Sequence, residues 1–592
     1  MNSHIPALAL TFFLYLVLGL SYFGWGQTVT SVLKVKNQSI HPDITLVWLG
    51  WATTLLIFQI LHFLFPLTAY VVVPVLIIGV MFSYKKVVNI LRCWLQKPSN
   101  KLKFAGILSI SLAFAVWIAS RSMLSPTTYD SGLYHFNTIR WINSYRIIPG
   151  LGNLHGRLAF NQSFFTYVAA LNFYPFFNNG RAIANSFLFI LTLATMIGYL
   201  SPIINRPSII IRSHPYKFLP ALFALPILGY FALNSDGFSS PSPDLASSLL
   251  QLSMFVILAR SITELLNGQD QQNYSALMIA ILAVTSITIK LSNLIFGAII
   301  LIYVLMYLWK SSHQPLREVI QILLPSTFVI LIWCIRGYVL SGTPLYPSTI
   351  GYIPAEWAVP REAIVIEANW IYSWARQPYT HWSNVIGSWK WLKPWILENY
   401  TNMTIMVYPL ALSVLYGLTS IILSFLKKGR RRRYLAYIIT LPVILALIYW
   451  FFSAPNPRYA NALFFILPVS MSIVFFAIIQ DFISKRVFVT LLFIAFVIGN
   501  LQYTRYFILN LSSLKAISIS GYHAVNKVAL NEKETPSGLV IYTPDIGDQC
   551  WDAPLPCTPY INTTLSLRKA GDITSGFMVT HFEDRQTPYD DY

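Results

Sequence analysis

Three carboxylates in this sequence stand beside apolar segments long enough to span a membrane, where acidic residues are rare. Asp130 lies in the stretch TTYDSGLYH and is the first acidic residue after Asp43. Asp236 and Asp244 lie in SDGFSSPSPDL, between two further apolar segments. Ionisable groups at membrane depth are costly and usually functional, and burial without a nearby cation raises the pKa of a carboxyl group. We therefore predict that these carboxylates are catalytic and that Asp130 is the proton-accepting base.

Basic residues near the ends of the same apolar segments could bind phosphate. His135 follows Asp130 in one loop, whereas Lys290 lies in SITIKLSN, Arg336 in WCIRGYVLSGTPLYP and Arg458 in APNPRYA. Lysine and arginine neutralise phosphate oxygens, and a guanidinium can donate two parallel hydrogen bonds to them. We predict that Lys290, Arg336 and Arg458 hold a phosphate group and that His135 assists the catalytic carboxylates.

Each of these residues also has a structural interpretation. The carboxylate of Asp130 could cap the amphipathic segment GLYHFNTIRWI, and that of Asp244 could favour the dipole of a helix that begins nearby. Asp236 precedes a glycine, which is typical of a turn. His135 could pack locally, and the three phosphate-binding candidates could instead extend to the membrane interface or pair with the acids.

The elements that must position these residues are membrane-spanning helices. The chain has 592 residues, of which 55% are hydrophobic and 11% charged, and this composition excludes an ordinary soluble domain. We predict a mainly α fold, a polytopic membrane bundle of about 14 transmembrane helices, because a helix of about twenty apolar residues crosses a bilayer. The first, at 6–23, is expected to be retained. Their centres fall near residues 15, 54, 75, 112, 190, 226, 254, 282, 300, 329, 414, 443, 470 and 497.

The distribution of Lys and Arg predicts which loops face the cytoplasm. The strongest basic groups lie at 85–103 and 427–433, and cytoplasmic loops collect such residues. The net charge of +19 is mostly a topology signal in this interpretation, and no nucleic-acid partner is expected. Alternate threading of the helices then places on the outer face the loops 121–180, 235–243, 341–403 and 453–460 and the tail from about 508.

The tail has the composition of a small soluble domain. It holds more Asp and Glu than Lys and Arg, and its stretch GLVIYT is strand-like. Cys550 and Cys557 are predicted to form a disulfide, which an oxidising compartment would preserve; two reduced thiols are the alternative. We expect three parts: N-terminal transmembrane helices (1–103), a transmembrane catalytic core (104–507) and an extracytoplasmic α+β domain (508–592).

The outer loop 341–403 is rich in tryptophan. Indole rings are platforms for sugar rings and are equally typical of the membrane interface. The sequence has no Gly-rich phosphate loop and no His or Cys metal motif, so no cofactor is predicted. The tryptophans are Trp357, Trp370, Trp374, Trp382, Trp389, Trp391 and Trp395.

The order of these motifs resembles that of the type C glycosyltransferase superfamily (GT-C), and the chain is similar to its multi-span bacterial members. The likeness covers roughly residues 104–507 and runs through YDSGLYH, SDGFSSPSPDL, KLSN and RGYVLSGTPLYP to a soluble tail. The resemblance implies an enzyme of the bacterial plasma (inner) membrane that transfers a sugar from a polyprenyl-phosphate donor on the outer face. By position, the resemblance assigns the base to Asp130, the second acid to Asp244 or Asp236, and phosphate contacts to Lys290, Arg336 and Arg458.

The reaction that the resemblance implies is displacement at the anomeric carbon with inversion. The acceptor would be a lipid, a glycan or a protein, and its hydroxyl would lose a proton to Asp130. Many relatives have two adjacent acids where this chain has Asp130 and then Ser131. A single carboxylate is a poor site for Mg²⁺ or Mn²⁺, so no metal is predicted.

Other classes of membrane protein remain open from the sequence. A lipid-linked glycan polymerase, ligase or flippase of cell-envelope polysaccharide synthesis would also have many spans and large outer loops, but would depend on Arg and His. A secondary transporter is expected to have paired halves with broken helices in matching places. A non-catalytic scaffold would tolerate neutralisation of Asp130, Lys290 and Arg336.

Overall fold

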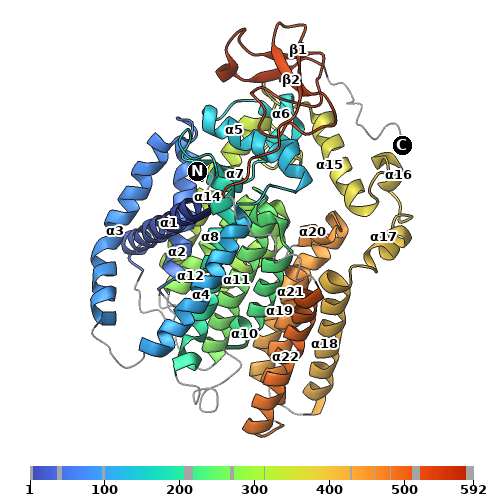
Figure 1. Ribbon diagram of the computed structural model, residues 1–592. Helices are drawn as coiled ribbons and strands as arrows, with labels where there is room; N and C mark the ends of the chain where they lie inside the picture. Colours follow the sequence, from blue (N-terminus) through green and yellow to red (C-terminus); the bar gives the residue numbers. More distant parts are fainter. Residues whose placement is uncertain are drawn as a thin grey trace.

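The computed structural model is mainly helical, as predicted from the apolar composition (Figure 1). It describes residues 4–35, 43–95, 101–205, 218–266, 273–311, 314–426, 430–460, 462–480, 482–509 and 521–581.

A helix is present at each of the fourteen centres predicted from the sequence. Within the described ranges, seven segments are long and apolar enough to cross a membrane, by length and composition, and six shorter apolar helices accompany them. A mainly helical protein with helices able to span a membrane is therefore confirmed, while the count of fourteen spans stays a prediction. The helices are α1 (His4–Val32), α2 (Thr45–Leu61), α3 (Ala69–Leu95), α4 (Lys101–Ser122), α8 (Gly180–Asn205), α10 (Leu219–Asn234), α11 (Pro243–Leu266), α12 (Asn273–Ile289), α13 (Leu294–Ser311), α14 (Pro315–Ser341), α18 (Tyr408–Leu426), α19 (Arg430–Ser453), α21 (Leu463–Ile479) and α22 (Lys485–Leu509).

The first three helices pack closely on one another and on the rest of the bundle. A Cβ atom added to Gly50 of α2 would lie 1.6 Å from the carbonyl oxygen of Tyr22 in α1, so only glycine permits this approach. Trp48 of α2 donates a hydrogen bond of 3.0 Å to Thr195 of α8. The helices within 1–103 thus share a core with the predicted catalytic part.

Short helices fill the two long loops that the sequence predicts on the outer face. In Figure 1 those of the first loop lie directly beneath β1 and β2, and those of the second lie beside them. This end of the bundle carries the candidate site. The first loop contains η1 (Ser131–His135), α5 (Phe136–Ser144), α6 (Leu151–Leu154), η2 (Gly156–Ala159) and α7 (Ser163–Leu171); the second contains α15 (Arg361–Arg376), α16 (Trp382–Val385), α17 (Leu392–Asn399) and η6 (Met403–Val407). Three more short helices are η4 (Asp236–Phe238), η5 (Leu291–Asn293) and α20 (Pro457–Ala460).

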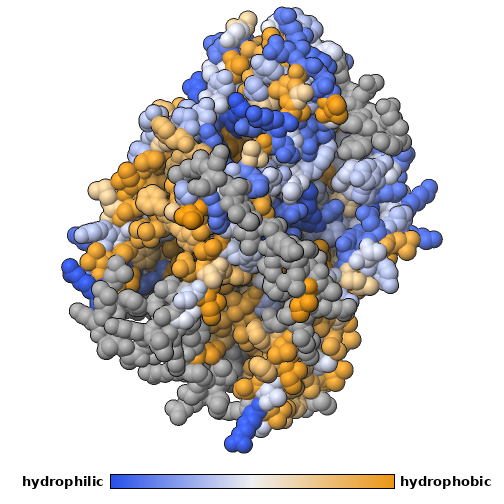
Figure 2. All heavy atoms as spheres, in the orientation of Figure 1, coloured by the Kyte–Doolittle hydropathy of each residue, from blue (hydrophilic) through white to orange (hydrophobic). Residues whose placement is uncertain are grey.

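The C-terminal segment forms two small antiparallel sheets over the short helices. β1 (Leu530–Glu534) pairs with β2 (Val540–Pro544), and β3 (Leu565–Leu567) pairs with β4 (Phe577–Val579), which follows η7 (Ile573–Ser575). Figure 2 shows a mostly hydrophilic surface around these strands and broad hydrophobic areas over the left flank and the lower bundle. That division is typical of a protein with one end in water and its flanks in lipid.

Candidate active site

Six charged side chains form one alternating chain of ion pairs at the end of the bundle beneath the C-terminal segment. Carboxylate and cation alternate, so each inner member has an oppositely charged neighbour on both sides. The successive contacts are Glu367–Arg157 at 3.6 Å, Arg157–Asp130 at 3.3 Å, Asp130–Arg458 at 2.7 Å, Arg458–Asp244 at 3.2 Å and Asp244–Lys290 at 2.5 Å. Four of the predicted site residues are thereby brought together: Asp130, Asp244, Lys290 and Arg458.

Asp130 precedes η1 but does not cap it. Its carboxylate makes no capping hydrogen bond to the backbone of the described chain. One carboxylate oxygen instead accepts a hydrogen bond from Arg157, and the other accepts one from Arg458. Burial alone would raise the pKa of this carboxyl, but the positive charges of Arg458 and Arg157 outweigh burial and lower the pKa to about 2. Asp130 is therefore an anion at neutral pH in this state, with both oxygens held.

Asp244 and Lys290 meet where two different helices begin or end. Asp244 lies in the first turn of α11, where a carboxylate also complements the helix dipole. Lys290 lies in the extended break between α12 and η5, and its side chain is 11% exposed. Its ammonium lies 4.9 Å from the ring centroid of Tyr459. The lysine is thus fixed by a carboxylate and an aromatic face.

Arg458 joins the two carboxylates. It lies on the short helix α20, and its guanidinium donates to Asp130 through Nη2 while Nε lies 3.2 Å from Asp244. Burial lowers the pKa of Arg458, but the negative charges of Asp244 and Asp130 outweigh that effect and raise it. Its side chain is 51% exposed, more than any other in the ion-pair chain. Among the three cations it is therefore the one most open to a ligand.

The sequence interpretation missed Arg157 and Glu367, although both belong to the ion-pair chain. Arg157 lies on η2 of the first loop, which also contains Arg140 and Arg146, so its position alone did not distinguish it. Glu367 reaches it from α15 of the second loop. A Cβ atom on Gly156 would lie 3.1 Å from the Glu367 carboxylate, so the glycine leaves room for the contact.

His135 lies next to the ion-pair chain but is buried among rings. Its Nδ1 lies 3.3 Å from the hydroxyl of Ser131, and its ring packs against Tyr134 and Phe165. Burial lowers the pKa of His135 to about 4, despite the opposing effect of Asp130. The imidazole is thus neutral at physiological pH, which agrees with its local-packing interpretation better than with a charged role.

Two predicted site residues lie elsewhere. Asp236 is exposed in the short helix η4, where the sequence allowed a turn, and the nearby cation is Arg121. Arg336 is buried in α14 and donates a hydrogen bond of 2.8 Å to Nδ1 of His62. Among the described contacts, neither residue joins the ion-pair chain: Asp236 is exposed, and the packing of α14 against α2 brings Arg336 to His62.

Two of the seven loop tryptophans serve packing in a buried cluster. Trp391 and Trp395 are buried in a cluster with Trp450 of α19, and Trp395 donates a hydrogen bond of 2.7 Å to the carbonyl of Pro455. Trp389 is 59% exposed. The cluster fixes the second loop against the helix that leads into α20, and so holds the backbone that carries Arg458.

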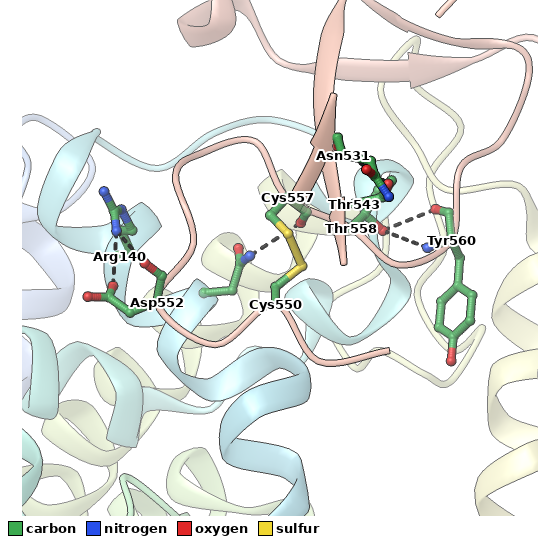
Figure 3. Close-up of a disulfide and its surroundings, with 9 residues drawn as sticks. Arg140, Asn531, Thr543, Cys550, Asp552, Cys557, Thr558 and Tyr560 are labelled. Atoms are coloured by element: carbon green, nitrogen blue, oxygen red, sulfur yellow. Dashed lines mark hydrogen bonds and ion pairs between the residues drawn. A yellow bond between two sulfur atoms is a disulfide. The ribbon is translucent and has the colours of Figure 1, made fainter. Parts of the chain in front are cut away.

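Cys550 and Cys557 are joined by a disulfide in the C-terminal segment (Figure 3). Within the described residues, no three His, Cys, Asp or Glu side chains converge as ligands of a metal ion. In the ion-pair chain, the carboxylates of Asp130 and Asp244 are bridged by the guanidinium of Arg458, which already neutralises them.

Comparison with curated proteins finds no match, and comparison with solved structures finds none. The sequence does match a family described as "Domain of unknown function (DUF8201)" over residues 8–465. That match includes the N-terminal helices and all six members of the ion-pair chain, and it covers more than half of the chain. The protein therefore belongs to the DUF8201 family.

Proposed function

We propose that the protein is a membrane glycosyltransferase that moves a sugar from a polyprenyl-phosphate donor to an acceptor hydroxyl, with inversion. The observation that carries the proposal is the bridge from Asp130 through Arg458 to Asp244, which joins a carboxylate of the first loop to a half-exposed cation. A base and a phosphate-binding group must lie on either side of the reacting carbon in such a reaction.

The charge balance of the site favours a donor with a single negative charge. Three carboxylates and three cations alternate, so each negative charge of a donor must draw a cation away from its carboxylates, and a single charge disturbs fewer of these pairs than a diphosphate would. A sugar phosphodiester carries one negative charge. It could be accepted if Arg458 turned from the carboxylates to a phosphate oxygen, supported by Lys290.

The same rearrangement would prepare the base. In the transfer, the bond from the anomeric carbon to the phosphate oxygen breaks, and a bond to the acceptor oxygen forms. The acceptor proton passes to Asp130, and the lipid phosphate leaves with the bonding electron pair. Loss of one arginine contact would raise the pKa of Asp130 from its low resting value, so donor binding would make the carboxylate a better base.

We place the protein in the bacterial plasma membrane with fourteen spans and with the ion-pair chain and C-terminal segment on the outer face. Support comes from the basic loops, which alternate threading assigns to the inner side, and from the disulfide, which persists in an oxidising compartment. Polyprenyl-linked sugars on that face need no nucleotide at the site.

The decisive experiment is transfer from a radiolabelled polyprenyl-phosphate sugar by the purified full-length protein. Asp130→Asn should lower kcat by about 100-fold or more, since a general base contributes that much. Asp236→Asn is the matched control, because it removes an exposed carboxylate outside the ion-pair chain. Retention of activity in Asp130→Asn would instead favour a lipid-linked glycan polymerase or ligase, and no transfer by the wild type would refute the proposal.

A further inference from the structure

The C-terminal segment contacts the turn that carries Asp130 from both sides. Just before Asp130, the hydroxyl of Tyr129 lies 2.5 Å from each carboxylate oxygen of Asp548, and the side chain of Gln549 donates to the Tyr129 carbonyl over 2.9 Å. Just after it, the amide of Trp551 donates to the Gly132 carbonyl over 2.8 Å. Asp130 thus lies between two residues, Tyr129 and Gly132, that are hydrogen-bonded to the C-terminal segment.

The contact between the C-terminal segment and this turn includes close packing as well as hydrogen bonds. A Cβ atom on Gly132 would lie 2.5 Å from the indole of Trp551, so the ring rests directly on the turn. The same ring packs on Phe136, with 6.1 Å between ring centroids. Trp551 has a φ of 47°, a conformation that is unfavourable for a bulky residue and persists only where the surroundings impose it.

The disulfide closes the loop that contains Trp551. Cys550 and Cys557 flank Trp551, and both are buried (Figure 3). The Cys557 carbonyl accepts a hydrogen bond of 3.2 Å from Asn137, and Arg140 donates one of 2.7 Å to the Asp552 carbonyl. The loop 548–557 is thereby fixed along η1 and α5, the elements that follow Asp130.

We propose that Trp551 and Asp548 are positioning residues for Asp130, and that the disulfide-closed loop 548–557 holds its carboxylate against Arg157 and Arg458. The catalytic part of this inference rests on the proposed function. Its structural part does not, because a turn held from both sides also fixes the ion pairs of Asp130.

The test compares Trp551→Ala, Trp551→Phe and a Cys550→Ser/Cys557→Ser double variant in the full-length protein. Trp551→Ala and the double variant should speed hydrogen exchange in residues 129–137. They should also lower kcat by about 100-fold with the donor KM unchanged, as expected when a base is misplaced by about 1 Å. Trp551→Phe keeps an aromatic ring on Gly132, so its hydrogen exchange in residues 129–137 and its kcat should stay close to those of the wild type. Asn531→Ala, which removes a hydrogen bond within the β1–β2 hairpin, is the control.

Two results would overturn the inference. One is unchanged hydrogen exchange of residues 129–137 in Trp551→Ala. The other is faster exchange in that variant while the stability that the ion-paired Asp130 carboxylate contributes above pH 4, and loses near pH 2, is the same as in the wild type. If the wild type transferred no sugar, the proposed function would fail. Hydrogen exchange and the dependence of unfolding on pH between 2 and 4 would still decide whether the loop positions Asp130.

Discussion

The guanidinium of Arg458 donates a hydrogen bond of 2.7 Å to the carboxylate of Asp130, although 328 positions of sequence separate the two residues. The same guanidinium approaches Asp244, so a single side chain couples the loop 121–180 to the start of α11. Arg458 is also the most exposed member of the ion-pair chain, and its replacement should affect both donor binding and the base.

Arg458→Gln should lower kcat/KM by about 100-fold or more, the usual result of removing a group that stabilises developing negative charge. Arg458→Lys should recover part of the loss, since lysine keeps the positive charge but cannot form the bidentate hydrogen bonds of a guanidinium. Arg568→Gln breaks the ion pair between Arg568 of the C-terminal segment and Glu356 of the loop 341–403, and is the matched control. Steady-state kinetics with varied donor would test this, and equal activity of Arg458→Gln and Arg568→Gln would contradict it.

Because of Asp130, the free energy of unfolding should fall as the pH is lowered from about 4 to 2. The pKa is about 2 in the folded protein against 3.8 in the unfolded chain, so its stabilising effect is complete above about pH 4 and disappears as the pH falls through 2. The difference corresponds to on the order of 2 kcal/mol. Thermal unfolding of wild type and Asp130→Asn in detergent should diverge above pH 4 and converge near pH 2. Parallel curves across this range would show that Asp130 is not ion-paired.

Lys290 and Asp244 should behave as a coupled pair. Removing one partner of a buried ion pair costs about 3–5 kcal/mol because the other charge stays buried without compensation. Lys290→Met and Asp244→Asn should therefore each destabilise the protein, while the double variant should be more stable than the sum of the two losses predicts. Unfolding measurements on all four proteins give the coupling energy, and additive losses would show that the contact is absent.

Gly156→Ala should disturb the link between the loops 121–180 and 341–403. The added methyl carbon would lie 2.9 Å from the Tyr346 hydroxyl and 3.1 Å from the Glu367 carboxylate, so both side chains must shift, and we expect the already long 3.6 Å contact of Glu367 with Arg157 to weaken. Glu367→Gln weakens the same contact without the steric change. Both variants should lower kcat in the same direction, whereas Gly417→Ala, at an uncrowded helical site, should not. A loss confined to Gly156→Ala would mean that crowding, and not the ion pair, matters.

Arg336→Met separates a structural arginine from a donor-binding one. Arg336 pairs with His62, whose pKa is lowered by burial and by the Arg336 charge, so the imidazole stays neutral and can accept the hydrogen bond. Loss of this contact should lower the unfolding temperature and leave the donor KM unchanged. An increase in KM without loss of stability would restore Arg336 to the donor site.

The sequence by itself determined the helices. Hydrophobicity is a local property of consecutive residues, so apolar runs marked a helix at every predicted centre, from α1 to α22. The rarity of acids likewise singled out Asp130, Asp236 and Asp244, because a carboxylate beside an apolar segment is expensive wherever the chain folds. Rarity alone could not tell that Asp236 would lie outside the ion-pair chain.

Only the tertiary structure decided which charges meet. Arg157 and Glu367 looked like any other loop residues until η2 and α15 were brought together. Arg336 was predicted to bind phosphate beside Lys290 and Arg458, but the packing of α14 beside α2 brings it to His62. Ion pairs depend on the distance between side chain ends, and the pairs here join residues between 27 and 328 positions apart. No local pattern encodes that distance, whereas the packing of the helices fixes it.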